Sequence, residues 1–223
     1  MGHAQPFADV DMARLNERGW QVVRRATGGR AILHTDELTY SVIAPADEPR
    51  VAGTVLESYN RLAEAMLGAV RKLGLSVEKN GNGVKPAPSA QNPVCFEVPS
   101  AYEITVGGRK LIGSAQARKK DGVLQHGSLP LTGDLTRICQ ALVFADEATR
   151  AEASARLLAR ATTVESVLGR ALDWETAAEA FVCAFEAQLG LTLERRALSA
   201  SELTRTDELV SEKYAHPSWT ERV

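Results

Sequence analysis

The sequence has few cysteines, no long apolar run and no excess of either charge. Its three cysteines, Cys95, Cys139 and Cys183, are odd in number and widely spaced, so they form neither a disulfide framework nor a paired zinc-ligand motif. We therefore expect free thiols and no metal site. No apolar stretch approaches the roughly 18 to 20 residues that span a bilayer, and no charged segment followed by an apolar stretch opens the chain. A cytoplasmic protein without a membrane partner is expected.

The charge balance and composition are those of an ordinary globular protein. Lysine and arginine number 26 against 28 aspartates and glutamates, which gives a formal net charge of −2. Because the chain has no overall basic footprint, nucleic acid is not an expected partner. An apolar fraction of 44% and a charged fraction of 24% favour a folded chain over a disordered one. At 223 residues the chain fits one domain, or one domain with a small appendage.

The residue pattern changes near Gly133, from β-rich before it to helical after it. Before this point we expect a helix over 9–18, strands over 20–24, 31–34 and 38–43, a helix over 55–72 that ends at Gly74, and strands over 94–98, 102–106, 110–115 and 123–131. After it we expect helices over 135–143, 147–161, 164–169, 175–189 and 201–214. These patterns predict an α/β part over 1–133 and a helical part over 134–223 that packs on the same domain.

Residues 79–93 are rich in proline, glycine and asparagine, a composition that favours an exposed, mobile loop able to serve as a lid. Another glycine-rich stretch, Gly28-Gly29, is flanked by Arg24, Arg25 and Arg30. A turn of this kind brings backbone N–H groups and fixed positive charge close to a carboxylate, a phosphate or a pantetheine tail. The alternative interpretation is a hairpin turn with solvated arginines.

Lys110 and Cys95 carry the other chemical signals. Lys110 stands among apolar residues on a predicted strand, where its ammonium group polarises an acyl carbonyl or simply reaches water at a strand edge. Cys95 opens a strand directly after the proline-rich stretch. Its thiolate would need a nearby cation or base, and Lys110, His34 and His126 are the candidates besides the arginines. The alternative is an inert buried thiol, which is also the favoured interpretation of Cys139 and Cys183.

Several motifs resemble one family. Residues 24–34, followed by 37–41, resemble the substrate-binding loop of the lipoate-protein ligase and octanoyltransferase family, in the biotin/lipoate protein ligase superfamily. Residues 94–103 (Val-Cys-Phe-Glu-Val-Pro-Ser-Ala-Tyr-Glu), 108–116 (Gly-Arg-Lys-Leu-Ile-Gly-Ser-Ala-Gln) and 124–128 (Leu-Gln-His-Gly-Ser) resemble its LipM-type octanoyltransferase branch. The motifs recur in order and cover most of the chain.

The resemblance implies an α/β (α+β) fold with a mixed sheet flanked by helices, like the catalytic domain of biotin protein ligases. It implies that Cys95 takes an octanoyl group from acyl carrier protein as a thioester, while Lys110 positions the acyl carbonyl. The acceptor would be a lysine of a lipoyl domain, on glycine cleavage H protein or a 2-oxoacid dehydrogenase E2, with no cofactor. The substrate-binding positions are then Arg24, Arg25, Thr27, Gly28, Gly29, Arg30, His34, Gly113, Ser114, Ala115, Gln125, His126 and Gly127.

Two alternatives stay open at this point. An ATP-dependent lipoate-protein ligase would use ATP and Mg²⁺ to form lipoyl-AMP, with Lys110 and the Gly28-Gly29 turn holding the adenylate and Cys95 incidental. A non-catalytic chain would bind lipoyl domains without turnover. The resemblance also implies that the family usually begins several tens of residues earlier, with a strand and a helix that help to build the sheet and the acyl pocket. The sequence is then either a fragment or a chain with a misassigned start, or, if Met1 is its natural start, we expect the sheet to lack one element and the acyl pocket one wall, so that activity needs a second polypeptide or is absent.

Overall fold

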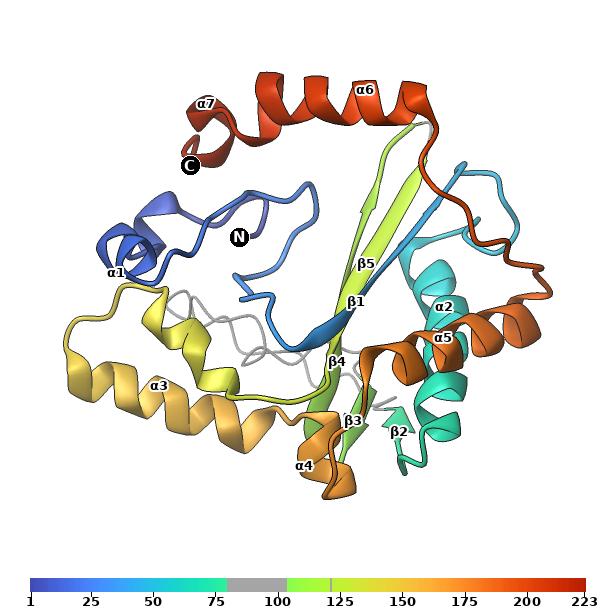
Figure 1. Cartoon of the computed structure of the whole chain (residues 1–223), viewed down its shortest axis with the longest axis horizontal. Helices are drawn as coiled ribbons and strands as arrows, with labels where there is room; N and C mark the ends of the chain where they lie inside the picture. The colour runs from blue at the N-terminus through green and yellow to red at the C-terminus, as the bar shows by residue number, and fades with distance from the viewer. Residues whose placement is uncertain (80–103, 121) are drawn as a thin grey trace.

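The computed structural model describes residues 1–79, 104–120 and 122–223, and its centre is a five-stranded sheet (Figure 1). The strand order is β1-β5-β4-β3-β2. The strands are β1 (Glu37–Ala44), β2 (Glu78–Lys79), β3 (Ile104–Val106), β4 (Arg109–Arg118) and β5 (Val123–Pro130). The expected loop over 79–93 and the expected strand over 94–98 lie almost wholly outside the described residues.

Every ladder between these strands is antiparallel, whereas we expected a mixed sheet. For the β3–β4 and β4–β5 ladders the reason is the short connections between the strands. Gly107 and Gly108 both have positive φ, 55° and 73°, and form a tight turn between β3 and β4. Between β4 and β5, Lys119 N donates to Gly122 O at 2.9 Å. Short turns join antiparallel neighbours, since a parallel pair needs a long crossover.

Two helices cover one face of the sheet, α2 (Val55–Lys72) and α5 (Trp174–Leu189), and they pack against each other (Figure 1). Thr54 caps α2 in a capping box with Glu57, and the helix is followed by Gly74 at a φ of 87°. Phe181 and Phe185 of α5 have stacked rings 6.2 Å apart, and both rings lie near Tyr40 of β1. Together these elements bury the larger apolar core.

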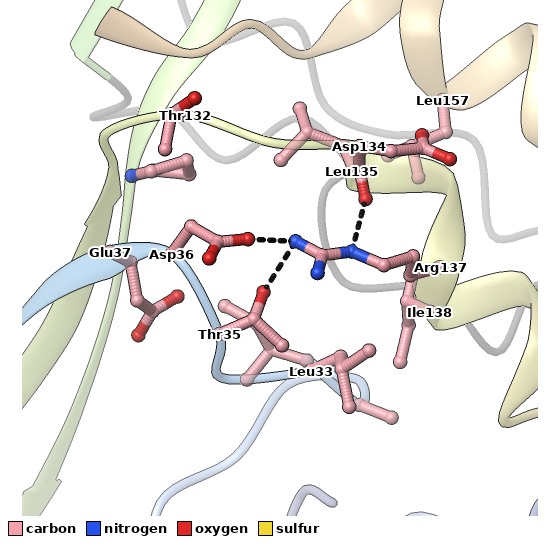
Figure 2. A pocket seen from close by; sticks show the side chains of 13 residues that line it. Leu33, Thr35, Asp36, Glu37, Thr132, Asp134, Leu135, Arg137, Ile138 and Leu157 are labelled. Carbon is pink, nitrogen blue, oxygen red and sulfur yellow. Dashed lines mark hydrogen bonds and ion pairs between the residues drawn. The ribbon is translucent and has the colours of Figure 1, made fainter. Parts of the chain in front are cut away.

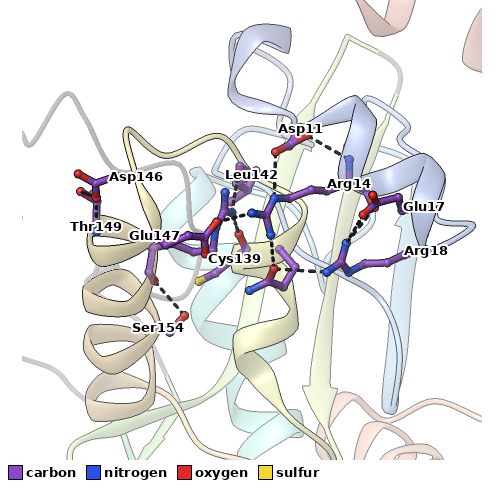
Figure 3. Close-up of polar contacts among 12 residues, drawn as sticks. Asp11, Arg14, Glu17, Arg18, Cys139, Leu142, Asp146, Glu147, Thr149 and Ser154 are labelled. Atoms are coloured by element: carbon purple, nitrogen blue, oxygen red, sulfur yellow. Dashed lines mark hydrogen bonds and ion pairs between the residues drawn. The ribbon is translucent and has the colours of Figure 1, made fainter.

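A second apolar core lies on the other side of the sheet, where the start of the chain meets α3 (Glu147–Arg160). It joins a 3₁₀ turn at Phe7–Asp9, α1 (Met12–Glu17) and a 3₁₀ helix at Leu135–Gln140. Polar contacts hold its rim, where Arg14 donates to Gln140 Oε1 at 2.6 Å and also pairs with Glu147 (Figure 3). Arg150 donates to Leu142 O at 2.7 Å. Both cores draw residues from each side of Gly133.

Two of the expected strands are wrong. Residues 20–24 and 31–34 are irregular, with no strand in either range. Main-chain groups at the end of the first range and between the two ranges bond to the start of the chain. Met1 N donates to Val23 O at 2.7 Å, Arg25 N donates to Met1 O at 3.0 Å, and His3 N donates to Thr27 O at 2.9 Å. The expected helix over 135–143 is a shorter 3₁₀ helix. The remaining expected helices form, with boundaries shifted by one or a few residues.

The chain ends in an arm that crosses the molecule and returns to its start. After α4 (Val164–Leu168) and α5 come α6 (Ala200–Leu209), a π turn (Val210–Tyr214) and α7 (Pro217–Thr220). α6 buries none of its residues and runs along the top of the view in Figure 1. α7 anchors the arm, because Trp219 Nε1 donates to Arg24 O at 2.8 Å. No helix in the described part of the chain is long and apolar enough to cross a membrane.

Candidate active site

A pocket lies where the irregular segment 25–34 meets strands β4 and β5. Its wall is formed by Arg25, Gly28, Gly29, Ile32, His34, Gly113, Ser114, Ala115, His126, Gly127 and Ser128. Three segments far apart in the sequence thus meet at one place, and most of the predicted substrate-binding residues are among them. The pocket therefore brings together the glycine turn, the Gly-Ser-Ala stretch of β4 and the His-Gly stretch of β5.

Arg25 shapes the glycine turn from inside. Its Nε donates to Thr27 Oγ1 at 3.0 Å, and one terminal nitrogen donates to Gly28 O at 2.8 Å and to Arg30 O at 2.9 Å. Gly29 has a φ of 95°, a conformation that favours glycine. The Arg25 guanidinium group therefore fixes the conformation of the turn and also lines the pocket. Arg25 is thus not the solvated arginine that the hairpin-turn interpretation expected.

His126 and Thr27 connect the turn to the sheet. Thr27 Oγ1 lies 2.6 Å from His126 Nε2, and the Thr27 side chain is fully buried. Burial, and then the nearby Arg25 and His34, lower the pKa of His126 from 6.5 to about 4. The imidazole is therefore neutral at pH 7. His34, at the rim, has its Nδ1 2.6 Å from Glu37 Oε1.

A polar network supports the pocket from the opposite face of the sheet. Tyr40 OH lies 2.6 Å from Ser114 Oγ, and Gln125 Nε2 donates to Tyr40 OH at 3.2 Å. The Tyr40 ring occupies the space that Gly127 leaves, because a Cβ on Gly127 would lie 2.2 Å from Gly113 O and 2.9 Å from Tyr40 Cε1. Glycine is thus required at position 127 by close packing beneath the pocket.

The residues 1–186 match the family model described as the lipoyl protein ligase A/B catalytic domain. The chain belongs to this family. It is 41% identical to the octanoyltransferase LipM of Moorella thermoacetica over 214 residues, which cover 96% of this chain and 78% of that protein. It is 38% identical to the octanoyltransferase LipM of Exiguobacterium sibiricum, over 98% of this chain and 81% of that protein. The family membership inferred from the sequence motifs is confirmed.

Solved structures of lipoate-protein ligases share the fold. A bipartite lipoate protein ligase from Thermoplasma acidophilum superposes with a TM-score of 0.81 at 21% identity, covering 99% of this chain and 78% of that chain. A lipoate-protein ligase A bound with ATP gives a TM-score of 0.78 at 22% identity, covering 99% and 80%. At these identities the likeness establishes the fold alone. The predicted α/β fold with helices around a sheet is confirmed.

The structure places several predicted substrate-binding residues of this lipoyl ligase A/B domain outside the pocket wall. Arg24 is fully buried and donates to the main-chain oxygens of Gly2, His3, Gln5 and Thr220. Burial and the nearby Arg222 lower its pKa below the ordinary value. Arg24 therefore ties the two chain ends together. We expected Arg24 to face the substrate, but its side chain points to these main-chain oxygens instead.

Three more predicted residues lie near the pocket without lining it. Thr27 does not line the pocket itself but is hydrogen-bonded to His126, which does. Arg30 has a terminal nitrogen 4.0 Å from Asp9 Oδ2, which directs it toward the second core. Gln125 is fully buried on the Tyr40 face of the sheet, because successive residues of β5 point to opposite faces and His126 lines the pocket.

Of the two predicted catalytic residues, the structure describes only Lys110. Lys110 lies near the start of β4 and is 6% exposed, and its main-chain oxygen accepts from Thr162 N at 3.0 Å. A parallel bridge also joins Lys110 to Ala161. Cys95 lies outside the described residues. The pairing of Cys95 with Lys110 therefore stays a prediction.

Ser128 was missed as a site residue. It is 1% exposed, it lines the pocket, and its Oγ has no hydrogen-bond partner among the residues that the structure describes. Buried hydroxyl groups are normally bonded, so an unpaired one facing a pocket points to a ligand. Its place at the end of the Gln-His-Gly-Ser stretch was the one available signal, since side-chain bonding cannot be read from a sequence.

A larger, mainly apolar cavity of about 580 Å³ adjoins the pocket. The two share Arg25, Ile32, His34 and His126. The apolar part of the cavity wall comes from the second core and the segment before the turn, namely Val10, Leu15, Trp20, Val22, Val23, Leu33, Ile138 and Leu142. The polar pocket therefore opens beside a space suited to a hydrocarbon chain.

A small hollow of about 40 Å³ lies at the start of β1 (Figure 2). It shares with the apolar cavity the wall residues Ala31, Ile32, Leu33, Thr35 and Ile138. Arg137 fills its mouth, donating to Thr35 Oγ1 at 3.0 Å and pairing with Asp36. Figure 2 shows the guanidinium group facing these two side chains. Arg137 thus joins the 3₁₀ helix to the segment before β1. The hollow itself is small, and this ion pair already satisfies the Arg137 and Asp36 charges.

Proposed function

We propose that this chain transfers an octanoyl group from acyl carrier protein, through a thioester on Cys95, to a lysine of a lipoyl domain in lipoate biosynthesis. The observation that carries this proposal is 41% identity to an octanoyltransferase LipM over 96% of the chain. The second support is the pocket, which joins the predicted binding motifs beside an apolar cavity. The acceptor, a glycine cleavage H protein or a 2-oxoacid dehydrogenase E2, and the cytoplasmic location are part of the same proposal.

The apolar cavity takes the hydrocarbon chain in this proposal. Its volume of about 580 Å³ is within the range of roughly 300 to 1,000 Å³ that is usual for small-ligand sites. The carbonyl end of the acyl group then lies in the polar pocket, between the glycine turn and His126. Apolar walls exclude water, which protects a thioester from hydrolysis.

The chemistry proceeds in two acyl transfers. The Cys95 thiolate attacks the carbonyl carbon of the carrier thioester, the carrier's pantetheine thiolate leaves, and a thioester on Cys95 forms. The neutral amine of the acceptor lysine then attacks this thioester, loses a proton, and releases the Cys95 thiolate. Lys110 stabilises the negative charge that develops on the carbonyl oxygen in both steps. A thioester is already activated, so no nucleotide or metal ion takes part.

The two alternatives differ in what they require. An ATP-dependent ligase would need the free acid, ATP and Mg²⁺, and its activity would survive Cys95→Ala. A non-catalytic chain would bind a lipoyl domain and transfer nothing from either donor. One set of assays therefore distinguishes the three functions: it measures which acyl donor is used and whether transfer survives Cys95→Ala.

The test is intact-mass measurement after incubation with octanoyl-carrier protein, or with octanoate, ATP and Mg²⁺. We expect one octanoyl adduct on the wild type from the carrier protein alone, and transfer to a lipoyl domain when one is added. Cys95→Ala should abolish both. Cys183→Ala is the matched control, because Cys183 is exposed and open to non-specific acylation. ATP-dependent transfer that survives Cys95→Ala would overturn the proposal.

A further inference from the structure

We infer that Ser128 donates a hydrogen bond to the carbonyl oxygen of the octanoyl group during transfer; this rests on the proposed function. Ser128 is 1% exposed and lines the pocket, yet within the described part of the chain its Oγ has no hydrogen-bond partner. A buried hydroxyl group that stays unpaired destabilises the fold. Such a group persists where a ligand supplies the missing partner, so it marks a binding position in the wall.

Two other serines show that the bonding state of Ser128 is unusual. Ser58 is fully buried as well, but Gln116 Nε2 donates to its Oγ at 2.8 Å and Arg118 donates at 3.1 Å. Ser114 lines the same pocket, but its Oγ lies 2.6 Å from Tyr40 OH. Ser128 therefore differs from both in having a hydroxyl proton free to bond with a bound molecule.

The position of Ser128 fits a role at the reacting end of the substrate. It pairs with Gly113 on β4, and it lies two residues from His126 on β5, so its side chain points to the same face as the imidazole. The glycines at 28, 29 and 113 leave that part of the wall without side chains. An acyl group can thus approach the sheet closely there.

The chemistry of the substrate identifies the atom that is bound. An octanoyl group has a single oxygen, the carbonyl oxygen, and its hydrocarbon chain offers no acceptor. A hydroxyl group inside an acyl pocket therefore bonds to the carbonyl oxygen. As the attacking group adds to the carbonyl carbon, negative charge grows on this oxygen and the hydrogen bond strengthens. Ser128 keeps its proton throughout, and no covalent bond forms at its oxygen.

The test compares Ser128→Ala with Ser58→Ala, the same substitution at a similarly buried but bonded serine. For Ser128→Ala we expect kcat of carrier-dependent transfer to fall by about 10²-fold, with a smaller change in KM. The Tm should stay equal or rise, because the substitution removes an unpaired polar atom. For Ser58→Ala we expect the reverse: a lower Tm and a kcat close to that of the wild type.

A spectroscopic measurement adds a signature that a structural role would not produce. Infrared spectra of the enzyme acylated by carrier protein that bears a carbonyl-¹³C octanoyl group should show a higher C=O stretching frequency in Ser128→Ala, because a hydrogen bond to the oxygen is lost. An unchanged kcat, or a fall in kcat that parallels a fall in Tm, would overturn the inference while leaving the proposed function intact. A wild type that transfers no acyl group would overturn both.

Discussion

Trp219 donates its indole N–H to the main-chain oxygen of Arg24 at 2.8 Å, which links the end of the chain to the residue before the site arginine Arg25. The ring is held on its faces by two cations, with Arg222 Cζ at 3.8 Å and Lys213 Nζ at 4.2 Å from its centroid. Cations over an aromatic face attract it electrostatically. This contact anchors the arm, because α6 itself buries no residue.

Trp219→Ala should lower the free energy of unfolding by about 2–4 kcal/mol, since it removes packing, two cation–π contacts and the bond to Arg24. Trp219→Phe keeps a ring for the cations but has no donor, and should cost about 1 kcal/mol. Urea unfolding measures both. Trp174→Ala is the control, because Trp174 is 51% exposed. Equal losses for Trp219→Ala and Trp174→Ala would show that the arm is not anchored at Trp219.

His126 should make stability depend on pH. Its pKa is lowered from 6.5 to about 4, chiefly by burial. Between these values the unfolded chain binds a proton that the folded chain does not, so the free energy of unfolding falls as the pH drops. A pKa shift of this size corresponds to a loss of roughly 3 kcal/mol in the free energy of unfolding once the pH is below both pKa values. Because the ring is partly exposed, we expect a loss of about 1–2 kcal/mol between pH 7 and pH 4.5.

The measurement is urea unfolding of the wild type and of His126→Gln at pH 7 and pH 4.5. The variant should lose this part of the pH dependence, since glutamine does not titrate. His34→Gln serves as the comparison, because His34 lies at the exposed rim. If the wild type and His126→Gln lost equal stability on acidification, His126 would not be the group responsible.

The two glycines of the turn should respond differently to alanine. A Cβ on Gly28 would meet no atom within 4 Å, and Gly28 lacks a positive φ. Gly28→Ala should therefore leave Tm unchanged, and any rise in KM for the acyl carrier would report a substrate that passes close to this residue. Gly29→Ala places a Cβ 2.9 Å from an Arg25 nitrogen at a φ of 95°, so it should lower Tm by several degrees. Thermal unfolding and steady-state kinetics of both variants test this.

The long helix and the hairpins were predictable because local signals and tertiary packing agree there. Helical periodicity over 55–72, the Thr54 cap and Gly74 all point to α2. Segments 20–24 and 31–34 look like strands, yet both are irregular. Val23 O accepts a hydrogen bond from the N-terminal ammonium group of Met1, a partner that no local pattern reveals. The glycine turn was found as a motif, whereas its organisation by Arg25 depends on bonds that only the folded turn creates.

Arg24 and Arg25 show most clearly where sequence reasoning stops. Both were predicted to bind substrate, because adjacent arginines before a glycine turn look alike in a sequence. In the structure Arg24 points to the chain ends while Arg25 curls around the turn and lines the pocket. An irregular backbone has no fixed alternation of faces, so the side that each residue takes could not be deduced from spacing.

These opposite positions give the last prediction. Arg24→Lys replaces a planar fork that donates to four main-chain oxygens by a single ammonium group, which leaves buried acceptors unpaired. We expect the free energy of unfolding to fall by about 2–3 kcal/mol, with little change in kcat/KM for the folded enzyme. Arg25→Lys loses a set of bonds around the turn that are only partly buried. It should cost about 1 kcal/mol of stability and lower kcat/KM about tenfold.

Urea unfolding and steady-state acyl transfer on the two variants separate fold support from substrate binding. Arg30→Lys is the matched control, because its guanidinium group is part exposed and 4.0 Å from Asp9 Oδ2, so both quantities should stay near wild type. A catalytic defect in Arg24→Lys without loss of stability would return Arg24 to the substrate-binding residues that the sequence motif predicts. Because Trp219 donates a hydrogen bond to the main-chain oxygen of Arg24, that outcome would also indicate that the C-terminal arm affects acyl transfer.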